Sequence, residues 1–147
     1  MTIGYFDTSA VIPLILAEPT SEVSRRLWTS VNRRASCVVV WPEAAAALAK
    51  AHRMGRIDNA GLETAVSNLD RIIEQIDLIV VTADSARRAA GLGIQLGLRG
   101  FDAVHVAAST QLPRDDIIGI SGDRSMVDAW RRLGVATVDT STTASRP

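Results

Sequence analysis

The sequence contains little cysteine and no excess of charge of either sign. Cys37 is the only cysteine among 147 residues, which excludes an intramolecular disulfide and a zinc site made of several thiolates. The 16 Lys and Arg residues are balanced by 16 Asp and Glu residues. The chain therefore has no net basic field with which to hold nucleic acid irrespective of its sequence.

Long hydrophobic runs are also missing. The longest uncharged apolar run near the N-terminus, residues 10–17, is far shorter than the roughly 20 residues that a helix needs to span a bilayer. No cationic stretch precedes this run, as a secretory signal peptide would require. We therefore expect a cytoplasmic protein with no membrane partner.

The length and the apolar content are those of an ordinary folded domain. A hydrophobic fraction of 47% excludes a wholly disordered chain. The chain length fits one domain with a sizeable core. We expect a single domain over residues 1–138, followed by a polar C-terminal tail at residues 139–147 that is frayed.

Short apolar runs alternate with amphipathic segments along the chain. This alternation predicts an α/β fold in three layers (α/β/α), with a central, mainly parallel sheet covered by helices on both faces. The expected strands are residues 3–6, 38–40, 78–82, 117–120 and 135–138. The expected helices are residues 8–17, 21–32, 44–54, 59–76, 85–96, 102–112 and 123–133.

Four acids stand just after apolar runs or at the start of a helix. Asp7 follows the first strand, Glu43 follows residues 38–42, Asp123 follows the strand near residue 120, and Asp102 opens a helix. Parallel strands all end at one edge of a sheet, so these carboxylates can converge there. Gathering them costs several kcal/mol unless protons or a cation intervene, and a hard divalent cation such as Mg²⁺ takes oxygen ligands. A metal held by acids alone favours phosphate chemistry over a zinc peptidase.

Helix capping explains the same positions. Asp is a preferred N-cap residue, worth about 1 kcal/mol, so each acid taken alone fits that role. Asp84 also follows a predicted strand and passes the same test. Position alone therefore gives five candidates and supports convergence and capping equally.

Two runs of residues resemble a known family. Phe6-Asp7-Thr8-Ser9-Ala10 and residues 98–108 (Leu-Arg-Gly-Phe-Asp-Ala-Val-His-Val-Ala-Ala) are similar to characteristic motifs of PIN-domain ribonucleases, especially the VapC-type toxins. Glu43, at the start of its helix, resembles the middle acid of that family. Ser121-Gly122-Asp123 followed by residues 130–138 resembles its C-terminal segment. The similarity spans about residues 3–138.

The resemblance implies a PIN-like fold and a metal-dependent endoribonuclease, the toxin of a toxin–antitoxin pair. By this resemblance Asp7, Asp102 and Asp123 hold Mg²⁺ or Mn²⁺, directly or through water. Glu43 completes the catalytic cluster and positions or deprotonates the attacking water, while Asp84 is left as a helix cap. The implied partners are an RNA substrate, a cognate antitoxin that blocks the cleft, and a second copy of the chain in a homodimer. The apolar helices at residues 10–17 and 44–51 are candidate contact surfaces, and core packing explains them equally well.

Several polar residues near the acids are further candidates. Arg99 and Arg124 are adjacent to the predicted site and are candidates for phosphate contact. Ser9 is a candidate to hydrogen-bond the acid cluster, with helix capping equally supported. His105 lies one turn after Asp102 and is a candidate to contact the site, but we favour a structural role for it on the face of the helix.

Two alternatives use the same architecture. Receiver and haloacid-dehalogenase domains need a Lys near the end of a late strand, whereas the only Lys of this chain, Lys50, lies in an early helix. The dehalogenase motif also needs a second acid where Ser9 stands. The remaining alternative is a catalytically silent PIN-like RNA- or protein-binding module, and the presence of all four acids argues against it.

Overall fold

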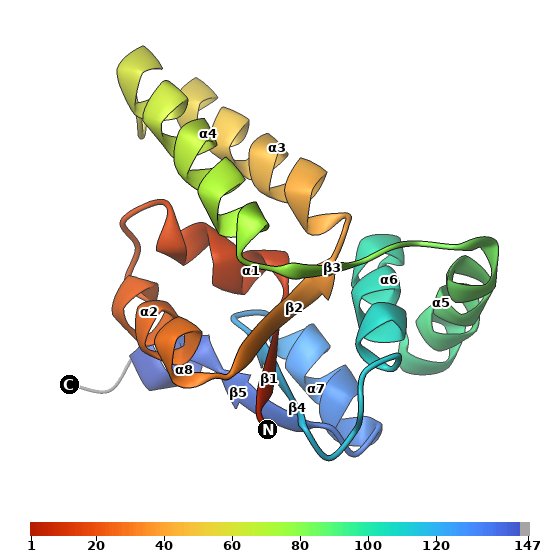
Figure 1. Cartoon of the computed structure of the whole chain (residues 1–147). Coiled ribbons are helices and arrows are strands. Elements are labelled where there is room, and N and C mark those ends of the chain that lie inside the picture. Colours follow the sequence, from red (N-terminus) through yellow and green to blue (C-terminus); the bar gives the residue numbers. More distant parts are fainter. Residues whose placement is uncertain (145–147) are drawn as a thin grey trace.

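Five parallel strands form one sheet in the computed structural model, which describes the backbone of residues 1–144 and the side chains of residues 1–142 (Figure 1). The strand order is β3-β2-β1-β4-β5, and every neighbouring pair is parallel. The predicted parallel sheet is therefore confirmed. The strands are β1 (Ile3–Phe6), β2 (Arg33–Cys37), β3 (Asp77–Ile79), β4 (Ile117–Ser121) and β5 (Ala136–Asp139).

Helices cover both faces of the sheet, which gives the predicted three layers. Side chains of β1 alternate between the faces, as the strand period requires. Phe6 packs with α1 to α4 in one core, whereas Ile3 and Tyr5 pack with α6 and α7 in the other. The helices are α1 (Thr8–Val11), η1 (Ile12–Leu14), α2 (Ser21–Ser30), α3 (Val40–Arg53), α4 (Asn59–Glu74), α5 (Ala83–Leu96), α6 (Gly100–Ser109), α7 (Arg124–Arg132) and α8 (Thr140–Ala144).

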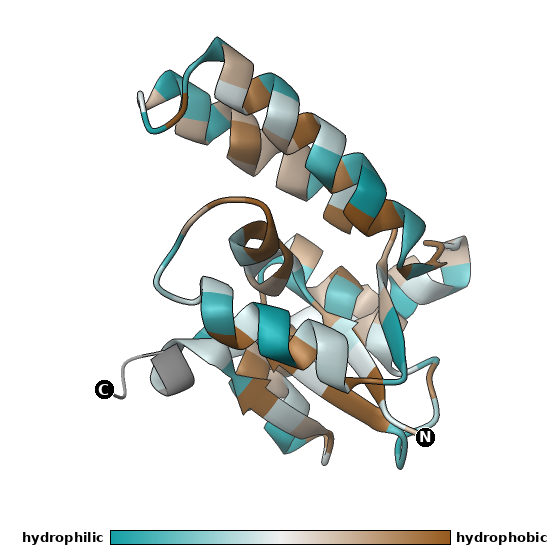
Figure 2. Ribbon diagram, turned by 60° about the vertical axis from the view of Figure 1, so that its left-hand side comes forward, coloured by the Kyte–Doolittle hydropathy of each residue, from teal (hydrophilic) through white to brown (hydrophobic). Residues whose placement is uncertain are grey.

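Helices α3 and α4 lie side by side and extend away from the sheet (Figures 1 and 2). Asp58 caps α4 by accepting a hydrogen bond from the backbone N–H of Gly61 at 2.7 Å. Ala44 and Leu48 of α3 are fully buried in the core, as are Ala10 and Val11 of α1. These side chains are therefore core residues and offer no contact surface to a partner.

The second strand lies earlier than predicted. The run at residues 38–40 is β-branched, but its first two residues form a turn and Val40 begins α3. Pro42 then falls in the first turn of α3, where its missing N–H removes no helical hydrogen bond. The true strand starts with Arg33, whose guanidinium pairs with Asp77 of β3 at 2.8 Å. Its last three residues, Ala35, Ser36 and Cys37, are buried in the sheet.

The ends of two helices also differ from the prediction. Pro13 divides the first helix into α1 and a short 3₁₀ turn. Thr82, and not Asp84, is the N-cap of α5, because its hydroxyl accepts from the N–H of Ser85 at 3.1 Å. Asp84 is exposed and pairs with Arg87 at 3.9 Å.

The end of the chain is more ordered than expected. Asp139 is the last residue of β5, and its carboxylate accepts a hydrogen bond from the N–H of Ser141 at 2.9 Å at the start of α8. Thr140 is fully buried. Residues 139–144 therefore belong to the fold and not to a polar tail, and residues 145–147 lie outside the described part. Within that part, no helix has both the length and the apolar character needed to cross a bilayer.

Candidate active site

Asp7 leaves the carboxyl end of β1 and is 4% exposed. It stands at the N-cap position of α1, but its side chain accepts no capping hydrogen bond. Its carboxylate accepts instead from the hydroxyls of Ser9 at 2.7 Å and Ser121 at 3.0 Å. Capping therefore does not explain Asp7, and the predicted contact of Ser9 with the acid cluster is present.

Asp123 ends the loop after β4 and has two roles. Its Oδ1 caps α7 by accepting from the N–H of Ser125 at 2.9 Å. Its Oδ2 pairs with the guanidinium of Arg99 at 3.4 Å. Its backbone N–H donates to the Ser121 hydroxyl, which in turn donates to Asp7, so the two acids share a serine bridge.

Asp102 and Glu43 lie in the first turns of α6 and α3. Asp102 pairs with the Nε of Arg99 at 3.2 Å, so this one arginine bridges Asp102 and Asp123. Glu43 accepts from the hydroxyl of Thr8 at 2.8 Å and lies 2.7 Å from Nε2 of His105. His105 therefore does contact the site, contrary to the structural place favoured from the sequence.

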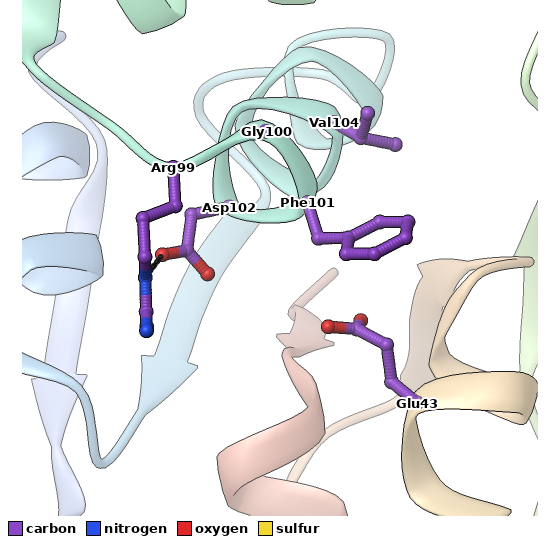
Figure 3. Close-up of a pocket in the computed structure, with 6 residues that line it drawn as sticks. All are labelled: Glu43, Arg99, Gly100, Phe101, Asp102 and Val104. Carbon is purple, nitrogen blue, oxygen red and sulfur yellow. Dashed lines mark hydrogen bonds and ion pairs between the residues drawn. The ribbon is translucent and has the colours of Figure 1, made fainter. Parts of the chain in front are cut away.

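Glu43 and Asp102 reach into one pocket of about 600 Å³ (Figure 3). Figure 3 shows their carboxylates directed from α3 and α6 toward the same space, with Arg99 beside Asp102. Phe101 is 61% exposed and forms much of the apolar wall. The pocket is lined by Glu43, Arg99, Gly100, Phe101, Asp102 and Val104.

Burial and neighbouring groups shift the carboxyl pKa values in opposite directions. Desolvation raises the pKa of Asp7 to about 6, although the electrostatic influence of the His105 ring and the hydrogen bonds from Ser9 and Ser121 lower it. Burial also raises the pKa of Glu43, but hydrogen bonds from His105 and Thr8 outweigh it, so the net shift is downward. Two carboxyl groups at one edge of the sheet thus have pKa values that are moved apart, which is common at functional sites.

The donor set suits a hard divalent cation. The three candidate ligands, Asp7, Asp102 and Asp123, are all carboxylates, which Mg²⁺ and Mn²⁺ prefer. The Arg99 guanidinium lies between Asp102 and Asp123 and supplies the positive charge that these acids require. Among the side chains that the structure describes, no three His, Cys, Asp or Glu residues are grouped closely enough to hold a metal ion. The carboxylates are thus of the right chemical kind and are held here by Arg99 and by hydroxyl groups.

The remaining candidates are placed as follows. Arg124, the first residue of α7, is exposed, and its positive charge acts on Asp139 at the end of β5. Ser121 links Asp7 with Asp123. Tyr5 was not predicted as a site residue; its hydroxyl lies 2.8 Å from Nδ1 of His105. Only a hydrophobic position in a buried strand is visible for Tyr5 in the sequence.

The sequence is similar to those of known proteins. The sequence profile of the PIN domain matches residues 4–124. Ribonuclease VapC46 of Mycobacterium tuberculosis H37Rv is 31% identical over 134 residues, which are 91% of this chain and 95% of that protein.

Solved structures share the fold. M. tuberculosis VapC20, described as a toxin that cleaves the sarcin–ricin loop, has a TM-score of 0.65 and 19% identity, covering 86% of this chain and 94% of that one. A chain of a toxin–antitoxin complex from Klebsiella pneumoniae has a TM-score of 0.63 and 16% identity, covering 93% and 97%. At these identities the structural likeness concerns the fold.

Proposed function

The chain belongs to the PIN domain family, and on this basis we propose that it is an endoribonuclease, the toxin of a toxin–antitoxin pair, which hydrolyses RNA phosphodiester bonds with water. The observation that carries the proposal is Asp7. This buried carboxylate ends a central strand, caps no helix, and is tied through Ser121 to Asp123. Burying an ionised carboxylate costs free energy unless a cation or a proton compensates its charge. The position of Asp7 is therefore better explained by a function than by stability.

Asp7, Asp102 and Asp123 would hold Mg²⁺ or Mn²⁺, and Glu43 would complete the cluster. A divalent cation bound there would lower the pKa of a water molecule and offset the charge that develops on the phosphate. Glu43 faces the pocket with a side chain that is 24% exposed, so its carboxylate can orient the attacking water and accept its proton. Ser9 keeps the Asp7 carboxylate oriented.

Arg99 is the best placed residue for the RNA backbone. Its side chain is 82% exposed, and its guanidinium already binds carboxylate oxygens of Asp102 and Asp123. A guanidinium binds phosphate oxygens by the same fork of N–H donors. Arg124 lies further along the same edge, at the start of α7, and is proposed as a second phosphate contact.

An antitoxin and a second copy of the chain are the proposed protein partners. The name of the K. pneumoniae structure describes a toxin–antitoxin complex, and that fold is shared by this chain. The pocket wall offers exposed apolar surface beside the acids, because Phe101 lines the pocket and is 61% exposed. An antitoxin segment that covered this wall would also cover Glu43 and Asp102 and so prevent cleavage.

The proposal is tested by digesting total RNA with purified protein in Mg²⁺ or Mn²⁺, with and without EDTA. We expect cleavage that EDTA stops, and a loss of at least about 100-fold in rate for Asp7→Asn, because this variant removes a charge needed for cation binding. Asp84→Asn is the matched control, since Asp84 is an exposed helix acid outside the site. Undiminished cleavage by Asp7→Asn would refute the assignment, and RNA capture without cleavage would indicate the silent binding module.

A further inference from the structure

His105 connects the core of the protein to the pocket. Its side chain is 2% exposed and lies between Tyr5 of β1 and Glu43 of α3. Nδ1 is 2.8 Å from the Tyr5 hydroxyl oxygen, and Nε2 is 2.7 Å from Oε1 of Glu43. The two rings meet edge to face, with centroids 5.9 Å apart and planes at 83°. A buried imidazole is thus held at both nitrogens.

The neighbours of Tyr5 determine which nitrogen of His105 carries the ring hydrogen. The backbone N–H of Cys37 donates to the Tyr5 hydroxyl oxygen at 3.0 Å. Burial raises the pKa of Tyr5 well above its ordinary value, so the hydroxyl keeps its hydrogen. That hydrogen is therefore available to Nδ1, and a ring nitrogen that accepts leaves the other nitrogen as the donor. Nε2 then donates to Glu43.

The same carboxylate oxygen of Glu43 receives a second hydrogen bond. The Thr8 hydroxyl donates to Oε1 at 2.8 Å, beside the contact from His105. Among the described residues, no hydrogen bond is made to Oε2. Figure 3 shows the Glu43 carboxylate directed into the pocket toward α6. One oxygen is thus held by the protein and the other is left for the pocket.

We propose that His105, oriented by Tyr5, is a positioning residue that fixes the Glu43 carboxylate so that Oε2 faces the attacking water. The inference rests on the proposed function, in which Glu43 accepts the proton of that water. A Glu side chain has several freely rotating bonds, and holding one oxygen with two donors removes that freedom before substrate binds. The need to orient the Glu43 carboxylate gives a reason for burying a polar ring at His105, one turn after Asp102 on α6.

The kinetic test compares His105→Leu with His105→Gln, using a labelled fragment of the RNA that the wild-type protein cleaves fastest. The Gln amide keeps an N–H near the place of Nε2, whereas Leu keeps only bulk. We expect Leu to lower kcat by about 10- to 100-fold with KM changed less than about 3-fold, and Gln to restore most of kcat. Equal losses in both variants, or a change confined to KM, would overturn the proposal.

Ser109→Ala is the matched control. Ser109 lies one turn further along α6, is buried, and accepts a hydrogen bond from the Trp130 indole at 3.0 Å, away from the pocket. This variant loses a buried hydrogen bond of α6 without touching Glu43, so kcat should stay within about 2-fold of the wild type at a temperature where both are folded. A loss of kcat equal to that of His105→Leu would show that general damage to α6 is responsible.

A spectroscopic measurement tests the inference without activity. The ¹⁵N chemical shifts of the His105 ring should report hydrogen on Nε2 in the wild type, and the Nδ1 shift should change in Tyr5→Phe, which lacks the hydroxyl that donates to Nδ1. Hydrogen on Nδ1 in the wild type would overturn the proposal even if His105→Leu does not fold. A wild-type protein that shows the expected tautomer but never cleaves RNA refutes the proposed function, and with it the role of Glu43 that His105 serves.

Discussion

Asp7 is a carboxylate whose environment favours its protonated form. Its pKa rises from an ordinary 3.8 to about 6, chiefly because burial disfavours the charge. In the unfolded chain the group ionises near 3.8, so between that value and about pH 6 the folded state binds more protons. Stability contributed by Asp7 is therefore complete below about pH 4 and is lost as the pH rises through about 6.

This pH dependence gives a prediction at a single residue. Relative to Asp7→Asn, which carries no charge, the wild-type protein in EDTA should lose about 2.4 kcal/mol of unfolding free energy between pH 4 and pH 7. The measurement is urea denaturation of both proteins across this range. A constant difference between the two would mean that Asp7 ionises as it does in water, and would remove the reason to place a cation beside it.

The acids and their partners were not equally predictable at this scale. Residue type and position gave five candidate acids, because parallel strands end at one edge whatever the side chains do. Only the resemblance to PIN-domain ribonucleases separated Asp7, Glu43, Asp102 and Asp123 from Asp84. The hydrogen bonds from His105 to Tyr5 and Glu43 could not be predicted, since they join positions 62 and 100 residues apart. Such pairs depend on how α6 packs on the sheet.

The strands were predictable to different degrees. The apolar runs of β1 and β4 identified these central strands, because burial on both faces demands continuous hydrophobic residues. β2 begins with Arg33 and Arg34, so its hydrophobic signal is weak, and the stronger run that follows it forms a turn and the start of α3. The β-branched run at residues 38–40 therefore predicted a strand in this region but placed it after its true position in β2.

The contact between β4 and α7 gives a prediction for a secondary-structure element. Gly119 of β4 lies directly under the ring of Trp130, and a Cβ at this position would overlap the indole. Trp130 is fully buried and its indole N–H is bonded to Ser109, so the ring has little room to move. Gly119→Ala should therefore cost about 1–3 kcal/mol of unfolding free energy, measured by chemical denaturation.

Gly91→Ala is the control for that substitution. Gly91 lies inside α5, and a Cβ there meets nothing within 4 Å. Because Ala favours a helix more than Gly does, this change should stabilise the protein by up to about 1 kcal/mol. Equal effects of the two substitutions would contradict the claim that Trp130 packs against a bare backbone in β4.

Over the whole molecule, charge is balanced in number but not in position. The chain has 16 basic and 16 acidic residues, yet four acids stand at the carboxyl edge of the sheet, where Arg99 alone bridges two of them. This arginine and a divalent cation compensate the same negative charges. Under the proposed function they would compete for Asp102 and Asp123, so we expect Arg99 to weaken the binding of a cation at this edge.

This competition gives the last prediction. Arg99→Gln should bind Mn²⁺ about 2- to 5-fold more tightly than the wild type in calorimetry, because an exposed ion pair opposes the cation only weakly. The added Mn²⁺ should also raise the melting temperature more in the variant, since a ligand that binds only the folded state stabilises it by mass action. Arg87→Gln is the control, because Arg87 pairs with Asp84 on α5, away from the site. Weaker binding of Mn²⁺ by Arg99→Gln than by the wild type would contradict this prediction. It would mean that the guanidinium helps to bind the cation and does not compete with it for Asp102 and Asp123.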